Sequence, residues 1–149
     1  MKVTIRKMQM KDLAAVSELA MMANPHATKE KYKEHVLSEL RENPDLSLVA
    51  TDDRKVVGYV QADIQENSAV LEDIAVAEQY QKKGLGKTLL NEEIEALKRK
   101  GAKTVLAEVH YLCASAVPFY YRHSFRIVGF VQDYFGIGHD ALILKLVLQ

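Results

Sequence analysis

Cysteine is nearly absent from this chain of 149 residues, and neither sign of charge is in excess. The single cysteine, Cys113, excludes an internal disulfide and leaves no companion for the usual zinc-binding spacings. Lys plus Arg and Asp plus Glu number 20 each, so no overall field favours nucleic acid, a membrane surface or a polyacidic partner. We therefore expect no metal, no nucleic acid and no membrane partner, and a reducing, cytoplasmic location.

Long hydrophobic runs are also missing. No window approaches the roughly 20 apolar residues of a membrane-spanning helix, and the first residues alternate apolar and charged types instead of forming the apolar core of a secretion signal. Linkers, internal repeats and low-complexity stretches are not apparent. At this length one domain, residues 1–149, should bury about 68 to 70% of its unfolded surface. The chain is expected to be soluble and unprocessed.

Apolar spacing predicts strands alternating with helices. Helices are expected from Asp12 to Pro25, Lys29 to Glu42, Gly84 to Gly101 and Ser115 to His123, and strands at residues 3–8, 46–51, 56–64, 69–76, 104–109, 126–133 and 141–148. The second to fourth strands should form an antiparallel meander, and the helix after them a right-handed crossover between parallel neighbours. This order predicts an α+β fold in three α/β/α layers, with about four helices on both faces of a mixed sheet of about seven strands.

A glycine-containing turn, Gln-Lys-Lys-Gly-Leu-Gly-Lys at residues 81–87, lies between the fourth strand and the third helix. The start of a helix presents backbone N–H groups without partners and favours negative charge. Gly84 and Gly86 remove side chains that would keep a diphosphate from those groups, and the lysines add positive charge. The turn is typical of a phosphate-binding site.

Two common nucleotide-binding motifs do not fit this turn. A Walker A motif needs its first glycine at Gln81, and the dinucleotide fingerprint needs its third glycine at Leu89. The remaining pattern is Gln-x-x-Gly-x-Gly after a strand that reads Leu-Glu-Asp-Ile-Ala-Val at residues 71–76.

On these residues the sequence resembles the GNAT family of acetyl-CoA-dependent N-acetyltransferases. Residues 108–125 follow the pattern Glu-Val-x-x-x-Asn-x-x-Ala-x-x-Leu/Phe-Tyr-x-x-x-Gly-Phe of the branch that acetylates protein N-termini, which includes ribosomal-protein alanine N-acetyltransferases. The tail, with Tyr134 and Phe135 before His-Asp-Ala, is similar to that branch's ending. Cys113 and Ser124 depart from it, since they replace the usual Asn and Gly.

The resemblance implies direct transfer of acetyl from acetyl-CoA, without a metal, to a primary amine. The favoured acceptor is the N-terminal α-amino group of a protein or peptide. A polyamine or aminoglycoside acceptor stays open as an alternative, as does a catalytically silent coenzyme A-binding sensor module. Homodimer formation is likewise left open.

The resemblance also implies roles for individual residues. Glu108 would be the general base and Tyr120 the general acid that protonates the departing thiolate, with Glu72 as an alternative base. Adjacent strand residues point to opposite faces, so Glu72 and Asp73 are not expected to share the cleft. Tyr32 and Tyr134 are expected at the acceptor mouth. The residues expected to contact coenzyme A are Ile74, Ala75, Val76, Gln81, Lys82, Lys83, Gly84, Leu85, Gly86, Lys87, Cys113, Ala116 and Phe119.

Overall fold

A computed structural model describes residues 2–24 and 28–149 of the chain, and the helix stop expected at Pro25 lies outside them. One seven-stranded sheet has the order β1-β2-β3-β4-β5-β7-β6. Its strands are β1 (Val3–Lys7), β2 (Ser47–Asp52), β3 (Lys55–Gln65), β4 (Ser68–Val76), β5 (Thr104–His110), β6 (Arg126–Val131) and β7 (Ala141–Val147). Within the described part of the chain only β4 and β5 pair in parallel, as expected for strands joined by a helical crossover.

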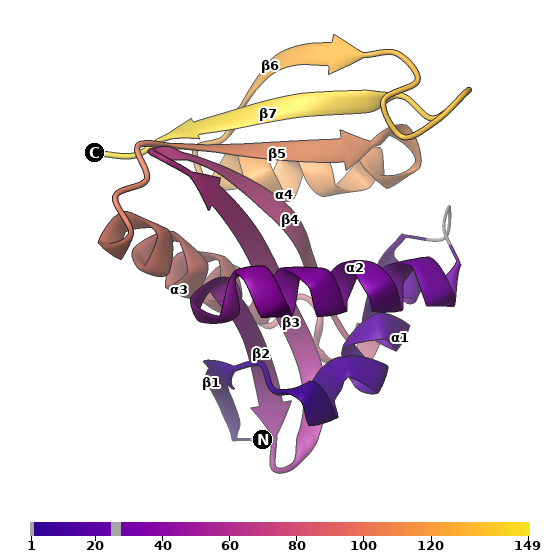
Figure 1. Ribbon diagram of the computed structural model, residues 1–149, viewed down its shortest axis with the longest axis vertical. Helices are drawn as coiled ribbons and strands as arrows, with labels where there is room; N and C mark the ends of the chain where they lie inside the picture. The colour runs from indigo at the N-terminus through magenta and orange to yellow at the C-terminus, as the bar shows by residue number, and fades with distance from the viewer. Residues whose placement is uncertain (1, 25–27) are drawn as a thin grey trace.

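Four α-helices cover the two faces of this sheet (Figure 1). They are α1 (Leu13–Ala23), α2 (Lys29–Glu42), α3 (Leu85–Arg99) and α4 (Val117–Arg122), and short 3-10 turns lie at η1 (Met10–Asp12), η2 (Pro44–Leu46), η3 (Glu78–Tyr80) and η4 (Tyr111–Ala116). The apolar residues form two clusters, one beneath α1 and α2 and the other beneath α3 and α4. The predicted three-layer α+β fold is confirmed. Among the described residues no helix is both long and apolar enough to cross a membrane.

Two differences between the observed and the expected element boundaries affect the site. The helix predicted from Ser115 begins as the 3-10 turn η4 and becomes α-helical only at Val117, because Cys113 has non-helical angles of φ −102° and ψ 18°. The sixth strand ends at Val131, before the predicted 133, and the chain then turns through Asp133 at φ 57°. The loop between β6 and β7 is therefore longer than expected. It comprises residues 132–140, and we call it the β6–β7 loop.

Strands β4 and β5 are paired only along the first part of their length. The parallel ladder runs from Ser68 opposite Thr104 to Leu71 opposite Ala107. Beyond this point β4 stays with β3 while β5 stays with β7, so the two strands diverge in Figure 1. Past the point of divergence, the backbone N–H and C=O groups that face the other strand have no partner on it.

A β-bulge on β4 changes the direction of its side chains. Gln61 on β3 pairs with Asp73 and the next residue, Ala62, pairs with Leu71, so Glu72 is the extra residue. The expectation that Glu72 and Asp73 face opposite sides of the sheet is wrong. Both side chains reach the layer of α1 and α2, because the bulge interrupts the regular alternation.

Candidate functional site

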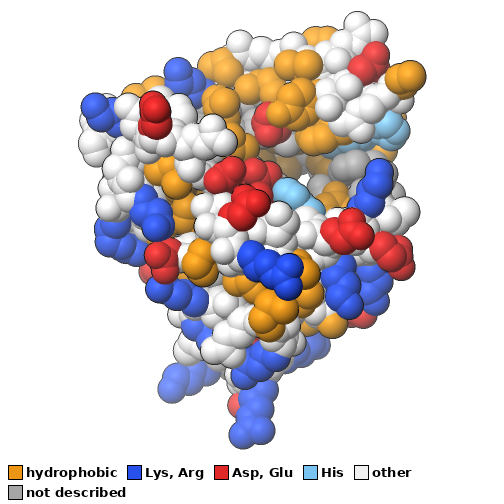
Figure 2. Space-filling model, in the orientation of Figure 1, with side chains coloured by type: hydrophobic (Ala, Val, Ile, Leu, Met, Phe, Trp, Pro, Cys, Tyr) orange, Lys and Arg blue, Asp and Glu red, His pale blue; other side chains and the backbone are white. Residues whose placement is uncertain are grey.

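A cavity of about 590 Å³ lies where β4 and β5 diverge. Its walls come from the end of α1, the start of α2, the two diverging strands, η4, α4 and the β6–β7 loop. The lining residues are Ala23, Asn24, Thr28, Lys31, Tyr32, His35, Leu71, Glu72, Asp73, Ile74, Glu108, Val109, His110, Cys113, Ala116, Tyr120 and Phe135. Figure 2 shows acidic side chains and a histidine gathered over this part of the molecule, beside a hollow in the surface.

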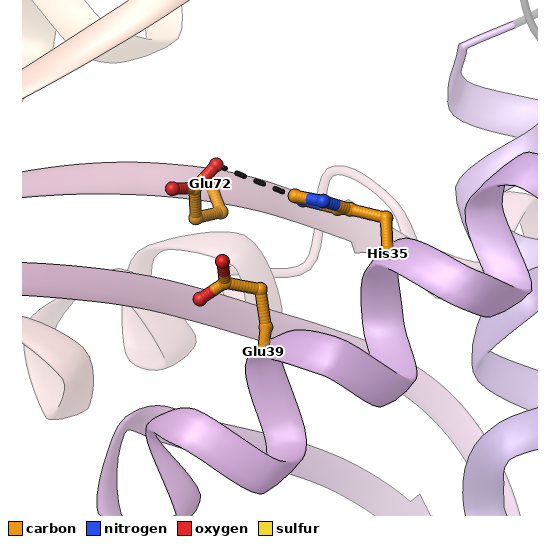
Figure 3. A group of neighbouring side chains, drawn as sticks. All are labelled: His35, Glu39 and Glu72. Carbon is orange, nitrogen blue, oxygen red and sulfur yellow. Dashed lines mark ion pairs between the residues drawn. The ribbon is translucent and has the colours of Figure 1, made fainter.

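Glu72 is a largely buried carboxylate on one wall of the cavity. Its Oε2 lies 3.6 Å from Nε2 of His35, and Glu39 also projects from α2 toward it (Figure 3). Burial raises the pKa of Glu72 to about 7, and the nearby carboxylates of Glu39, Asp63, Glu108 and Asp73 add to the rise. Burial also lowers the pKa of His35, so the imidazole is largely neutral at pH 7 and does not balance the acidic charge.

The cluster of His35, Glu39 and Glu72 offers three ligand atoms that lie within 4.8 Å of one another. An imidazole nitrogen with two carboxylate oxygens is a donor set that zinc and related ions accept. Cysteine count and linear spacing could not reveal this arrangement, since the fold brings Glu72 on β4 against two residues one turn apart on α2.

Asp73 is a cavity residue that sequence reasoning placed elsewhere. The hydroxyl of Tyr59 and the amide of Asn24 donate hydrogen bonds to its Oδ2, and the Ile74 N–H donates to Oδ1 at 2.9 Å. Burial raises the pKa of Asp73 to about 6, although these hydrogen bonds oppose the rise. No sequence signal distinguished this aspartate, because its direction depends on the bulge.

Glu108 faces Glu72 from the other diverging strand. The hydroxyl of Tyr134, on the β6–β7 loop, donates a hydrogen bond to Oε2 of Glu108. This hydrogen bond is the main cause that raises the pKa of Tyr134 to about 12. The structure thus joins two residues that the sequence had assigned separately to catalysis and to the acceptor mouth.

Tyr120 lies at the inner end of the cavity and is only 8% exposed. Burial, followed by the charge of Asp73, raises the pKa of its hydroxyl above the usual value, so the phenol keeps its proton at neutral pH. The adjacent Tyr121 instead lies on the surface, where the guanidinium of Arg126 stacks 4.1 Å from its ring centre. A protonated phenol next to the diverging strands can serve as a proton donor.

Cys113 connects η4 to the end of α1. Its thiol donates to the carbonyl of Ala23 and to Oδ1 of Asn24, both at 3.6 Å. Burial raises the pKa of the thiol, with a smaller effect from the charge of Asp73, so Cys113 is a poor nucleophile.

The turn at residues 81–87 begins α3 with Gly84 at φ 85°. The first intrahelical hydrogen bond runs from the Thr88 N–H to the Gly84 carbonyl, so the three preceding N–H groups, of Leu85, Gly86 and Lys87, come before the helical ladder. These N–H groups fit the requirement of a bound diphosphate, and Lys82, Lys83 and Lys87 around them are exposed.

The packing of α4 against α3 also favours glycine at position 86. A Cβ atom there would lie 3.3 Å from the ring of Phe119 on α4. The missing side chain therefore allows α4 to approach the start of α3, and Phe119 contributes to this junction instead of to the cavity lining.

Backbone groups of β4 also point into the diverging region. The Ala77 N–H donates to the Val57 carbonyl at 2.8 Å, which makes these two residues a hydrogen-bonded pair. Such pairs alternate along an antiparallel ladder, so the N–H and carbonyl of Val76, and those of Ile74, point away from β3. Since β5 has already diverged, these groups face the wedge. The Ile74 N–H donates to Oδ1 of Asp73 and the Val76 carbonyl accepts from Gln81, so the Ile74 carbonyl and the Val76 N–H are the groups that suit the amides of a pantetheine chain.

Fewer than half of the predicted site residues line the cavity, namely Tyr32, Glu72, Ile74, Glu108, Cys113, Ala116 and Tyr120. Tyr134 joins them through Glu108. Ala75, Val76, Gln81 and the rest of the turn lie outside the lining, although Gln81 is tied to the end of β4 by its side-chain amide, which donates to the Val76 carbonyl at 2.9 Å.

Comparisons with known proteins agree with this arrangement. Residues 13–125 match the sequence model of the Acetyltransferase (GNAT) family. A spermidine N(1)-acetyltransferase of Thermoplasma acidophilum is 30% identical and the match covers 85% of this chain and 90% of that protein. An N-alpha-acetyltransferase of Sulfurisphaera tokodaii is 28% identical (97% and 92% covered), and the ribosomal protein bS18-alanine N-acetyltransferase of Escherichia coli K12 is 26% identical (98% of each).

Solved structures that resemble this chain are also acetyltransferases by name or share their fold. The PaiA N-acetyltransferase of Thermoplasma acidophilum in complex with coenzyme A has a TM-score of 0.78 at 27% identity, covering 99% of this chain and 100% of that one. Ard1 from Thermoplasma volcanium has a TM-score of 0.89 at 22% identity, covering 100% and 99%, which shows the shared fold. Because the family model spans more than half of the sequence and the site has the matching geometry, this chain belongs to the GNAT family and is an acetyl-CoA-dependent N-acetyltransferase.

Proposed function

We propose that the protein acetylates the N-terminal α-amino group of a protein or peptide. The supporting observation is a set of exposed apolar side chains next to cavity residues in the chain, which we call the apolar border: Tyr111 and Leu112 stand between the lining residues His110 and Cys113, and Ile137 follows the lining residue Phe135 in the β6–β7 loop. Side chains that follow an N-terminal residue could pack on this border, whereas a polyamine has little apolar bulk to place there. The two relatives that act on protein or peptide α-amino groups by name are similar over nearly the whole chain.

Acetyl-CoA would enter the wedge between β4 and β5 and supply an activated acetyl thioester. The N–H groups at the start of α3 would hold its diphosphate, and the outward-facing carbonyl of Ile74 would accept a pantetheine amide N–H. The Val76 N–H would then polarise the thioester carbonyl by donating a hydrogen bond to its oxygen.

Glu72 is the better suited of the two carboxylates to take a proton from the acceptor ammonium. Its pKa of about 7 matches a base that works near neutral pH. Glu108 already accepts the hydroxyl of Tyr134, so we assign it to orienting the amine between the two strands. Tyr120 keeps its proton at this pH and would donate it to the departing thiolate sulfur.

An acceptor comparison tests the proposal. Release of coenzyme A is measured with a peptide that has a free N-terminus and an internal lysine, with the same peptide blocked at its N-terminus, and with spermidine. We expect release with the free N-terminus only. Equal rates for the blocked peptide would assign the activity to lysine side chains and contradict the proposal.

A polyamine acceptor is the second candidate, because Glu39, Asp63 and Glu72 give one end of the cavity a negative potential. A second ammonium of the acceptor could lie among these groups. The spermidine N(1)-acetyltransferase relative supports this reading. Turnover of spermidine that falls sharply in Glu39→Gln, without turnover of peptides, would favour it over the first candidate.

A further inference from the structure

A pair of histidines ties the end of β5 to the β6–β7 loop. His110, the last residue of β5, is 3% exposed, and its Nε2 lies 2.8 Å from Nδ1 of His139 in the loop. On the other side of the ring, Nδ1 of His110 accepts the N–H of Leu112 at 3.0 Å. Both ring nitrogens of His110 are therefore engaged.

This loop carries part of the acceptor wall. Its Phe135 ring lies 5.4 Å from the His110 ring and lines the cavity, and its Tyr134 holds Glu108. Besides the histidine pair, the Tyr111 N–H donates to the Asp140 carbonyl at 3.0 Å. The histidine pair is thus one of the contacts that attach the loop to the end of β5, and histidine is the side chain type whose charge changes near neutral pH.

The hydrogen-bond pattern fixes where the protons lie. Because Nδ1 of His110 accepts from Leu112, the proton of the neutral ring must be on Nε2, which donates to Nδ1 of His139. A proton added to His139 at Nδ1 would place two N–H groups against each other. A proton added to His110 at Nδ1 would break the hydrogen bond from Leu112. The pair is fully hydrogen-bonded only when both rings are neutral.

Charged and titratable groups surround the pair on each packed element. Among the described residues, the Tyr111 ring stacks on the His110 ring and the charge of Asp140 acts on it, while Asp133 and Tyr134 lie in the same loop as His139 and Glu108 lies on β5 with His110. Burial and His139 lower the pKa of His110, while Asp140 opposes this. A lowered pKa means that the attached loop binds the proton more weakly than the free loop does. Attachment is therefore favoured above the ordinary histidine pKa of about 6.5 and is lost as the pH falls below it.

We propose that His110 and His139 are positioning residues for the acceptor wall, which hold the β6–β7 loop against β5 while both rings are neutral and release it when the pair gains a proton. In the attached state Phe135 and Tyr134 complete the wall and Glu108 is held in place. In the released state the acceptor binds more weakly, while the coenzyme A contacts on β4 and α3 are unchanged. This consequence for the acceptor rests on the proposed function, whereas attachment of the loop does not.

The matched variants are His139→Asn and His139→Ala. Asparagine keeps an acceptor oxygen near the position of Nδ1 and does not titrate, whereas alanine removes the contact at every pH. Backbone amide NMR signals of residues 133–139 are followed between pH 8 and 5.5, with signals of β2 and β3 as the report that the fold is retained. We expect the wild-type loop signals to shift with a midpoint at or below about 6.5. His139→Asn should keep the attached positions throughout, and His139→Ala should show the released positions already at pH 8.

Any of three results would overturn the proposal. The wild-type loop signals could stay constant over this range, the signals of His139→Asn could shift as much as those of the wild type, or His139→Ala could show the attached positions at pH 8. In kinetics, the acceptor KM of the wild type divided by that of His139→Asn should rise by up to about fourfold between pH 8 and 6, which is the limit for one proton and a released-state pKa of about 6.5, with the KM for acetyl-CoA unchanged. Glu72 is present in both proteins, so the effect of its titration on KM cancels when one KM is divided by the other. If no peptide is acetylated at all, the proposed function fails while the NMR result still decides on the histidine pair.

Discussion

Glu72 illustrates how one residue can be unfavourable for stability and useful for chemistry. Its pKa of about 7 in the folded protein is above the 4.5 of a free glutamate, so the folded state holds the proton more tightly than the unfolded state. The stability that this confers is complete below about pH 4.5 and is lost as the pH rises through 7. The charged form that a base requires is thus the less stable one.

Glu72→Gln should lower kcat/KM by about 10² to 10⁴-fold if Glu72 is the base, because glutamine cannot take the proton. The wild-type pH profile should rise through an apparent pKa near 7, as Glu72 loses its proton, and this rise should vanish in the variant. The variant should also unfold at a higher temperature at pH 8. Initial rates from pH 5.5 to 9 and thermal melts check both.

Glu108→Gln is the companion variant. It should retain more activity and keep the rise near pH 7. A loss of activity in Glu108→Gln that exceeds the loss in Glu72→Gln would transfer the base role to Glu108.

Tyr120→Phe should reduce turnover by about 10²-fold with little change in the KM for acetyl-CoA, because the variant removes only the transferable proton. Tyr121→Phe is the control, since Tyr121 lies on the surface beside Arg126. Steady-state kinetics on both proteins measure the difference. Unchanged turnover in Tyr120→Phe would remove it from the proton transfer.

At the scale of elements, α3 contains a buried acidic residue that lowers the stability of the fold. Its buried face contains Glu93, which is fully buried and whose two carboxylate oxygens have no hydrogen-bond partner among the described residues. Burial raises the pKa of Glu93 to about 9. Its neighbours on the same face, Leu89, Leu90 and Leu97, have the spacing that the sequence predicted.

Glu93→Met should stabilise the protein, since methionine fills a similar volume without polar atoms. The unfolded glutamate loses its proton near pH 4.5 and the folded one near 9, so the wild type loses stability as the pH rises between these values. At pH 7 the gain should be on the order of 3 kcal/mol, and it should be smaller at pH 5. Urea unfolding at both values measures it.

Glu92→Met is the matched control, because Glu92 is the preceding residue on α3 and is exposed. It should change the free energy of unfolding by less than about 0.5 kcal/mol. A gain in Glu93→Met that is independent of pH would argue against a buried, protonated carboxyl group.

At the scale of the whole molecule, the wedge between β4 and β5 allows both substrates to bind together. Direct transfer then predicts intersecting initial-rate patterns when acetyl-CoA and acceptor are varied. Cys113→Ala should remain active, because the thiol is partly buried and protonated and its hydrogen bonds link η4 to α1. Parallel lines, or a labelled acetyl group trapped on Cys113, would show instead that the enzyme is acetylated first.

Much of the fold follows from local sequence. Alternation predicted the strands, 3.6-residue spacing predicted α1 to α3, and the glycine turn predicted the start of α3, because each depends on residues close together in the chain. The boundaries of η4 and of the β6–β7 loop did not follow, since they depend on single backbone angles at Cys113 and Asp133.

The sequence by itself determined the family and the crossover that makes β4 and β5 parallel, and it predicted a phosphate site at the 81–87 turn, because these depend on short-range pattern and order. Tertiary structure alone decided which acids share the cavity. The bulge turned Asp73 toward Glu72, α2 brought Glu39 and His35 beside them, and the loop placed Tyr134 on Glu108. A pKa near 7 at Glu72 arises from burial and from charges on three other elements, and no linear spacing carries that information.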